Sequence, residues 1–228
     1  MFGLRNYERL LSKLSEHKFK FSIDWKAHPS NRAILLRHDI DFSVDDALSI
    51  ALFEEKLNVR STYFFMLSSN TYNLLSYKNR STVERIKEMG HKISLHFDPT
   101  VYKSLEGFLE ERDTFKSAFN VELDVVSIHR PGKFLENSNV DLYGSNHTYQ
   151  DHYFKDLKYL SDSGGRDIFA PLVEFLDCQT EQSLHLLIHP VWWVNEFPSQ
   201  TQTLNNWRER NFEFITSEIR ANCKTYEG

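Results

Sequence analysis

The sequence has few cysteines and no long apolar run, and both shortages limit what the protein can be. Its 228 residues include only Cys178 and Cys223, which lie far apart and match no metal-binding or redox spacing. We therefore expect both to be reduced thiols, as in cytosolic proteins. No stretch is apolar for long enough to span a membrane, and the N-terminal residues lack the apolar core of a signal peptide. We thus expect a cytoplasmic protein with no membrane span.

Clustered basic residues are missing as well. The net charge is −5 and no basic stripe stands out, so we expect no nucleic-acid partner. Apolar side chains are abundant: 40% of the residues are hydrophobic, enough for a sizeable core. Aromatic residues make up 14%, and such side chains fill cores or line sugar-binding clefts. We expect residues 1–228 to form one domain, since α/β barrels often reach this length undivided.

Strand-like and helix-like segments alternate along the chain. The expected strands span residues 33–37, 61–67, 92–97, 125–128 and 184–188. The expected helices span residues 7–14, 105–119 and 204–219, with one more capped by Ser43 and another ending at Gly90. This alternation predicts an α/β fold with a parallel sheet and outer helices. Residues 133–165 are polar with few clear elements, and we expect a long loop beside the cleft.

Four of the expected strands end in polar, ionisable residues. These ends read RHDID (37–41), ISLHFD (93–98), SIHRPG (127–132) and LLIHP (186–190). Parallel strands bring their C-terminal ends to one face of a barrel or open sheet, where active sites form. The four ends are therefore expected to meet in one site.

Asp39 and Asp41 share one face of their strand, because side chains alternate along a strand. Two carboxylates this close repel each other, and one would hold a proton unless a cation stood between or beside them. A divalent metal removes that difficulty, since one carboxylate can bind it while the other stays free as a base. The alternative is a surface turn in which an aspartate caps the following helix.

His96 and Asp98 also share a strand face, and imidazole and carboxylate are both good ligands for zinc or a similar ion. A lone histidine on a strand is more often structural than a ligand. The presence of Asp41, His96 and Asp98 together at strand ends favours a metal site.

His189 closes an apolar strand and precedes Trp192 and Trp193. A histidine placed there can act as a general acid, because its pKa lies near neutral pH. The two indoles can shield it from water and give a sugar ring an apolar face. The alternative is that His189 only ends the strand and that the tryptophans belong to the core.

These motifs together resemble those of the polysaccharide deacetylases, the NodB-like carbohydrate esterases. LRHDID resembles the first motif of that family, GHKISLH its Gly-His-x-Ile-x-x-His motif, IHRPG its Arg-Pro motif and LLIHP its late histidine motif. The resemblance runs from about residue 33 to residue 193. It is closest to a cytoplasmic branch found in O-antigen and capsule biosynthesis, the WbmS-like proteins, which YLSDSGGRD (159–167) also resembles.

The resemblance implies a distorted (β/α) barrel that binds a divalent metal, with zinc expected, and acts on an N-acetylated sugar or glycan. The activity it implies is N-deacetylation by a carbohydrate deacetylase, in lipopolysaccharide or capsule biosynthesis. Carried over by position, Asp39 would be the catalytic base and His189 the general acid. Asp41 and His96 would hold the metal.

The chain departs from the family pattern at the second metal histidine, where it has Thr100. We expect Asp98 to replace that ligand, with His129 as second choice. Arg130 and Asp162 are expected to orient the base and the acid. Two alternatives stay open: a deacylase for another acyl amide or an O-acetyl ester, and a sugar-binding protein on a catalytically decayed fold.

Overall fold

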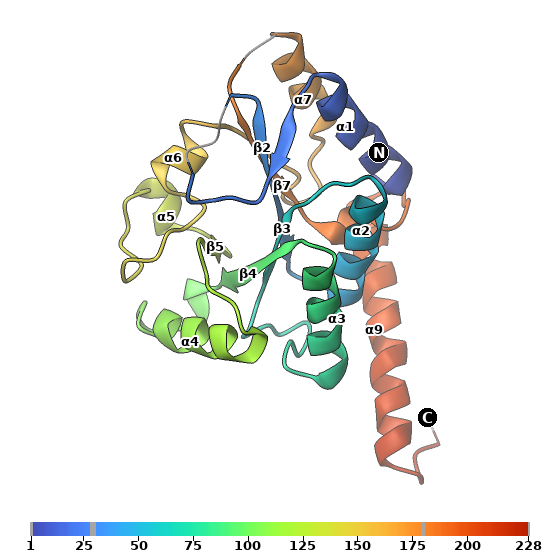
Figure 1. The fold of residues 1–228 in the computed structure, drawn as a ribbon. Coiled ribbons are helices and arrows are strands. Elements are labelled where there is room, and N and C mark those ends of the chain that lie inside the picture. Colours follow the sequence, from blue (N-terminus) through green and yellow to red (C-terminus); the bar gives the residue numbers. More distant parts are fainter. Residues whose placement is uncertain (1, 28–30, 179–180, 228) are drawn as a thin grey trace.

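Parallel strands form the centre of the molecule in a computed structural model, which describes residues 2–27, 31–178 and 181–227 (Figure 1). The strands are β1 (Lys20–Ser22), β2 (Ala33–Ile40), β3 (Thr62–Phe65), β4 (Lys92–Phe97), β5 (Ser127–Ile128), β6 (Lys158–Ser161) and β7 (Leu184–Ile188). Their order is β5-β4-β3-β2-β7-β6, with β1 paired to the beginning of β2. Every pairing is parallel, as the sequence predicted. The sheet curls into a half-barrel with helices outside.

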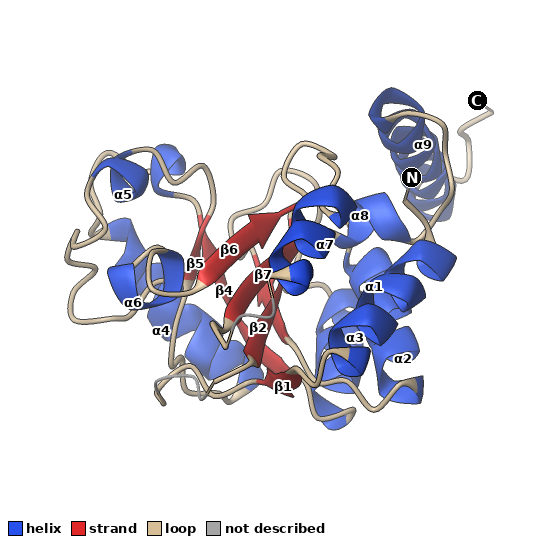
Figure 2. Cartoon of the chain, turned by 90° about the horizontal axis from the view of Figure 1, so that it is seen from above, coloured by secondary structure: helices blue, strands red, loops and turns tan. Residues whose placement is uncertain are grey.

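Helices lie on both sides of this sheet. They are α1 (Leu4–Glu16), α2 (Val44–Lys56), α3 (Tyr77–Glu88), α4 (Gly107–Phe119), α5 (Lys133–Glu136), α6 (Asp151–Phe154), α7 (Phe169–Asp177), α8 (Pro190–Trp193) and α9 (Gln200–Asn222). Seen from above, α1, α2, α3 and α7 lie on one side of the sheet, and α5 and α6 on the other (Figure 2). The C-terminal part of α9 extends beyond the rest of the molecule (Figure 1). No helix in the described ranges is long and apolar enough to cross a membrane.

Strand β2 separates two packed regions, because its successive side chains point to opposite faces of the sheet. Ile34 and Leu36 belong to the large core that also contains side chains of α1, α2 and α3. We call this side the outer face. The other side, the inner face, carries a smaller cluster made of Trp25, Leu35, Phe64, Val125, Tyr153 and Leu157. Arg37 and Asp39 follow Leu35 on the inner face, toward the C-terminal end of the strand.

The turn after β2 is fixed from two directions. As predicted, Ser43 caps α2, and its Oγ accepts a hydrogen bond from the Asp46 backbone N–H at 3.1 Å. The Asp46 carboxylate pairs with the Arg210 guanidinium of α9 at 3.0 and 3.1 Å. Trp207, also on α9, donates its indole N–H to the Phe42 carbonyl at 3.1 Å. Helix α9 therefore clamps the loop that follows Asp41.

The prediction of a long loop over residues 133–165 is wrong. This segment contains the short helices α5 and α6 and the whole of β6, which pairs with β7 from Lys158 to Ser161. Strand β6 is only four residues long and reads Lys-Tyr-Leu-Ser, so its pairing with β7 stabilises it more than its composition does.

Candidate metal and acid–base site

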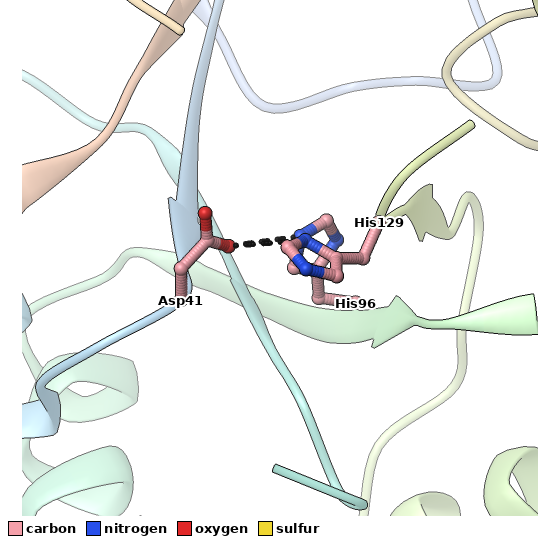
Figure 3. A group of neighbouring side chains, drawn as sticks. All are labelled: Asp41, His96 and His129. Carbon is pink, nitrogen blue, oxygen red and sulfur yellow. Dashed lines mark ion pairs between the residues drawn. The ribbon is translucent and has the colours of Figure 1, made fainter. Parts of the chain in front are cut away.

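Three side chains from different strands meet at the C-terminal edge of the sheet. Asp41 follows β2, His96 belongs to β4 and His129 follows β5 (Figure 3). Asp41 Oδ1 lies 3.2 Å from His96 Nε2 and 3.5 Å from His129 Nδ1. One potential ligand atom from each residue lies within 4.8 Å of the other two. We call these residues the Asp41 trio.

The Asp41 trio fits a small divalent cation. Asp41 Oδ1 and both ring nitrogens of His96 are buried and have no hydrogen-bond partner among the described residues. Buried polar atoms are rarely left unpaired, because the loss of hydration costs about 1–3 kcal/mol for each group. Two ligands at about 2.0–2.1 Å from a tetrahedral zinc ion stand roughly 3.3 Å apart, close to the separations seen here. The unpaired atoms are therefore suited to a metal.

The charges within the trio favour the ionised aspartate. Burial alone would raise the pKa of Asp41, but the facing His129 and His96 imidazoles, with the nearby His189, hold that pKa well below its usual range. Burial lowers the pKa of His129, and the Asp41 carboxylate outweighs this effect and raises it. A carboxylate with two imidazoles is the ligand chemistry that zinc and similar ions take.

Asp39 stands beside the trio but is held by other groups. The Arg37 guanidinium donates two hydrogen bonds to its carboxylate, from Nε to Oδ1 at 2.8 Å and from Nη2 to Oδ2 at 2.6 Å. Ser127 Oγ donates to the same carboxylate at 3.0–3.1 Å and accepts from Arg37 Nη2 at 2.6 Å. Burial raises the pKa of Asp39, but the charge of Arg37 outweighs it and lowers that pKa to about 2. Asp39 is thus an anion 3.6 Å from His96 Nε2.

His189 approaches the trio from the end of β7. Its Nδ1 pairs with Asp162 Oδ1 at 2.6 Å, and its backbone N–H also donates to the Asp162 carboxylate. The other ring nitrogen, Nε2, lies 3.7 Å from Asp41 Oδ2. Burial lowers the pKa of His189, but the charge of Asp162 and its hydrogen bond raise it to about 9. The imidazole is therefore charged at neutral pH and can donate a proton through Nε2.

Two expected roles do not fit the geometry. Asp98 lies outside the trio, because its Oδ1 caps the 3-10 turn Pro99–Val101 and accepts from the backbone N–H and hydroxyl of Thr100. The second choice, His129, stands where the third ligand was expected. Arg130 does not orient Asp39. Its guanidinium is 66% exposed and lies 3.3 Å from Asp98 Oδ2.

The tryptophans are core residues and offer no ring to a sugar. Trp193 is fully buried, and its indole N–H donates to Asp162 Oδ2 at 2.7 Å. Trp192 is 5% exposed and belongs to the large core. Both lie on α8, the single turn that begins directly after His189, and this turn folds them inward. This burial agrees with the alternative that the tryptophans belong to the core, and Trp193 and His189 both bond the Asp162 carboxylate.

A second buried cluster of acid and histidine lies on the outer face. We call it the Glu54 cluster; its members are Glu54, Tyr7, His38, Ser61, Tyr63 and His91. Oε1 of Glu54 accepts from Tyr7 and pairs with His38 Nε2 at 2.8 Å. Oε2 accepts from Ser61 at 2.6 Å and Tyr63 at 2.8 Å. Both oxygens are saturated, which is typical of a structural cluster.

Sequence reasoning missed Arg37 and Ser127, the two partners of Asp39. A signal for Arg37 was present, because it stands two residues before Asp39 and so shares its strand face. Ser127 likewise stands two residues before His129 at the end of β5. A charged residue on an otherwise apolar strand is rarely buried without a partner, and Asp39 is the nearest carboxylate along that face.

Comparison with known proteins finds similar folds. No family model and no curated protein matches the sequence. Among solved structures, the peptidoglycan deacetylase PdaC from Bacillus subtilis has a TM-score of 0.50 and 13% identity, over 86% of this chain and 99% of that chain. A Streptococcus mutans CE4 esterase has a TM-score of 0.48 and 16% identity, over 78% and 82%. A CE4 family pseudoenzyme from Bacillus anthracis, BA3943, has a TM-score of 0.45 and 14% identity, over 82% and 62%. The likeness to the Bacillus subtilis structure shows that this chain has the distorted barrel of the NodB-type deacetylases, as the sequence predicted.

Proposed function

We propose that the protein is a metal-dependent deacetylase that removes an acetyl group from an N-acetylated sugar. The observation that carries this proposal is the pair of opposed groups beside the Asp41 trio. Asp39 is held as an anion by Arg37, and His189 is held as a cation by Asp162. A site with a base and an acid on either side of a potential metal has the parts that amide hydrolysis needs.

The Asp41 trio would hold the metal through the Asp41 carboxylate and the two imidazoles. When bound, a divalent cation supplies Lewis-acid activation of a water molecule and of the acetyl carbonyl. The donor set suits zinc, which we expect as the metal.

The chain's own residues would move two protons. Asp39 takes a proton from the attacking water, whose oxygen forms a bond to the acetyl carbon. His189 gives the proton on Nε2 to the sugar nitrogen as the carbon–nitrogen bond breaks, so that acetate and an amine leave. Asp162 holds Nδ1 of His189 at 2.6 Å and so aims Nε2 into the site. An amine leaves far more easily when protonated, and a charged imidazole there supports amide over ester cleavage.

The substrate context rests on the sequence resemblance. The similarity of residues 159–167 to the WbmS-like proteins supports a nucleotide- or lipid-linked sugar precursor of a surface polysaccharide, handled in the cytoplasm. The alternative of a decayed sugar-binding protein arose from Thr100 in place of a metal histidine. The position of His129 in the trio supports a complete ligand set and so favours an enzyme.

The test is acetate release from N-acetylated sugars, free, nucleotide-linked and lipid-linked, by protein treated with chelator and then reloaded with Zn²⁺. We expect turnover that requires the metal and falls about 10²- to 10⁴-fold in Asp39→Asn. Asp45→Asn is the matched control, because Asp45 is an exposed carboxylate paired with Lys78 on the outside of α2. N-formyl and O-acetyl sugars belong in the same panel. Zn²⁺-loaded protein that turns over none of them would refute the proposal.

A further inference from the structure

The two aspartates at the end of β2 are chemically alike, yet their carboxylates are held differently. Asp41 Oδ1 has no hydrogen-bond partner in the described chain, whereas both oxygens of Asp39 are bonded. Asp39 is nevertheless close enough to bind the same ion, since its Oδ2 lies 3.6 Å from His96 Nε2. The cluster whose potential ligand atoms lie within 4.8 Å of one another nonetheless contains Asp41 and leaves out Asp39.

We propose that Arg37 is a positioning residue that keeps Asp39 out of the metal shell and so reserves it as the catalytic base. This inference rests on the proposed function. Arg37 is fully buried, and its planar fork meets both carboxylate oxygens of Asp39 at 2.6–2.8 Å. A bidentate pair of this kind fixes the carboxylate plane as well as its charge. Asp41 has no such partner and stays available as a ligand.

The guanidinium is itself locked in place. It lies over the rings of Phe64 and Tyr149, at 5.7 and 5.3 Å from their centroids. Such stacking suits a planar guanidinium better than an ammonium group, so lysine is not an equivalent replacement. Burial and the charge of Arg37 lower the pKa of His185 to about 3, so this imidazole stays neutral.

Ser127 connects the Arg37–Asp39 pair to β4, the strand that carries the expected metal ligand His96. Its hydroxyl bridges Arg37 and Asp39, and in the sheet it pairs with His96 of β4. Ser127 stands two residues before His129 on the same chain segment. The bridge therefore sets Asp39 at a fixed place relative to two members of the trio.

The buried Arg37 contrasts with the exposed Arg130. The arginine of the IHRPG motif turns to the surface and contacts Asp98, with a left-handed φ of 50°. The guanidinium bound to Asp39 instead comes from β2, the strand of the aspartates themselves. Base and positioning residue are thus two residues apart, as R-x-D.

The test compares the parent with Arg37→Met, Arg37→Lys, Asp39→Asn and the double variant Arg37→Met/Asp39→Asn, each loaded with Co²⁺. The visible absorption of Co²⁺ reports the number and kind of its ligands. We expect Asp39→Asn to keep the parent spectrum, since Asp39 is not a ligand there. Arg37→Met should change the spectrum as Asp39 enters the shell, and the double variant should restore it. Arg37→Lys, which keeps the positive charge, tests the same point if Arg37→Met does not fold, and should give an intermediate change.

Kinetics separate this role from simple support of the fold. With substrate, Arg37→Met should lower kcat about 100-fold with KM within about twofold. An unchanged Co²⁺ spectrum in folded Arg37→Met and Arg37→Lys would overturn the inference, as would a parent spectrum that changes in Asp39→Asn or a parent that binds no Co²⁺. The spectra need no substrate, so the inference can hold even if no acetate is released. Acetate release with unchanged spectra would instead support the proposed function and refute the positioning role of Arg37.

Discussion

Two buried clusters of acid and histidine lie on opposite faces of one sheet, and they differ in how completely their oxygens are paired. In the Glu54 cluster, tyrosine, serine and histidine groups bond both carboxylate oxygens. In the Asp41 trio, Asp41 Oδ1 and both nitrogens of His96 have no hydrogen-bond partner in the described parts of the chain. The same residue types therefore stabilise the fold on the outer face and stand ready for a ligand on the inner face.

The difference follows from the position of each cluster along the strands. The Glu54 cluster includes His38, whose side chain enters the large core between the sheet and the outer helices. The hydroxyl groups of Tyr7 and Tyr63 donate to the Glu54 carboxylate there, and burial excludes other hydrogen-bond partners. The trio lies on the inner face of the sheet, at the C-terminal ends of the strands, where Asp41 remains partly exposed. Pairing of the carboxylate oxygens, more than residue type, separates the two clusters, since His38 Nδ1 and His91 Nε2 of the Glu54 cluster also lack a hydrogen-bond partner among the described residues.

Removing a ligand from the trio should have the largest effect. We expect His129→Ala to abolish tight Zn²⁺ binding and to lower deacetylase activity at least about 10³-fold, or about 4 kcal/mol. Asp98→Asn should cost no more than about 10- to 100-fold, because Asp98 stands behind His129, 3.9 Å from its Nε2. Equilibrium dialysis with Zn²⁺ and an acetate assay measure both effects. Equal metal loss in the two variants would contradict the choice of His129 over Asp98.

Neutralising Glu54 on the outer face should lower the stability of the fold and leave the deacetylase activity intact. Glu54→Gln exchanges an acceptor oxygen for a donor among four hydrogen-bonding groups, so we expect the free energy of unfolding to fall by about 3 kcal/mol. Glu55→Gln, at the exposed neighbouring position on α2, should stay within about 0.5 kcal/mol of the parent. Urea unfolding gives these values. Activity per folded molecule and Zn²⁺ stoichiometry should match the parent, and a loss of bound zinc would contradict the separation of the two clusters.

Acid should weaken the outer cluster over a defined pH range. Burial raises the pKa of Glu54, but the charge and hydrogen bond of His38 outweigh it and lower that pKa from its usual 4.5 to about 2. An acid whose pKa is lower in the folded state stabilises the fold above its unfolded pKa and loses that contribution as the pH falls. Stability should therefore decline between about pH 4.5 and about pH 2, more steeply in the parent than in Glu54→Gln. Identical slopes in urea unfolding across this range would refute the assignment.

The smallest effect should come from the exposed arginine. Arg130→Met removes the pair between an exposed guanidinium and the buried Asp98, whose Oδ1 keeps two hydrogen bonds from Thr100, so kcat/KM should fall less than about threefold. The buried Arg37 has the same side chain and a far larger expected effect. A loss of kcat/KM for Arg130→Met as large as that for Arg37→Met would instead assign the functional arginine to the IHRPG motif.

The sequence predicted the parallel sheet and the meeting of its strand ends, because both follow from local patterns. The apolar run before Arg37 and the alternation after it specify a buried strand with two carboxylates on one face. Strand β6 could not be predicted, since it owes its existence to pairing with β7. The direction of Trp193 depends on the turn of α8 and on the distant Asp162, which no local pattern contains.

The third ligand could not be chosen from sequence for a similar reason. Asp98 and His129 both follow strands that end at the site, so strand geometry admits either of them. The choice depends on the 3-10 turn after β4, in which Thr100 donates two hydrogen bonds to Asp98 Oδ1 and turns that carboxylate away. Arg37 was missed because charge on a strand end suggests exposure, whereas this guanidinium is buried by its bond to Asp39.

The most direct test of a metal site at the Asp41 trio is a crystal structure of the Zn²⁺-loaded protein with anomalous difference density at the zinc edge. We expect one peak bonded to a carboxylate oxygen of Asp41 and to ring nitrogens of His96 and His129, with Asp39 still bonded to Arg37 and not to the ion. A peak elsewhere, or a zinc ion ligated by Asp98 or Asp39, would contradict the assignment of the two buried clusters.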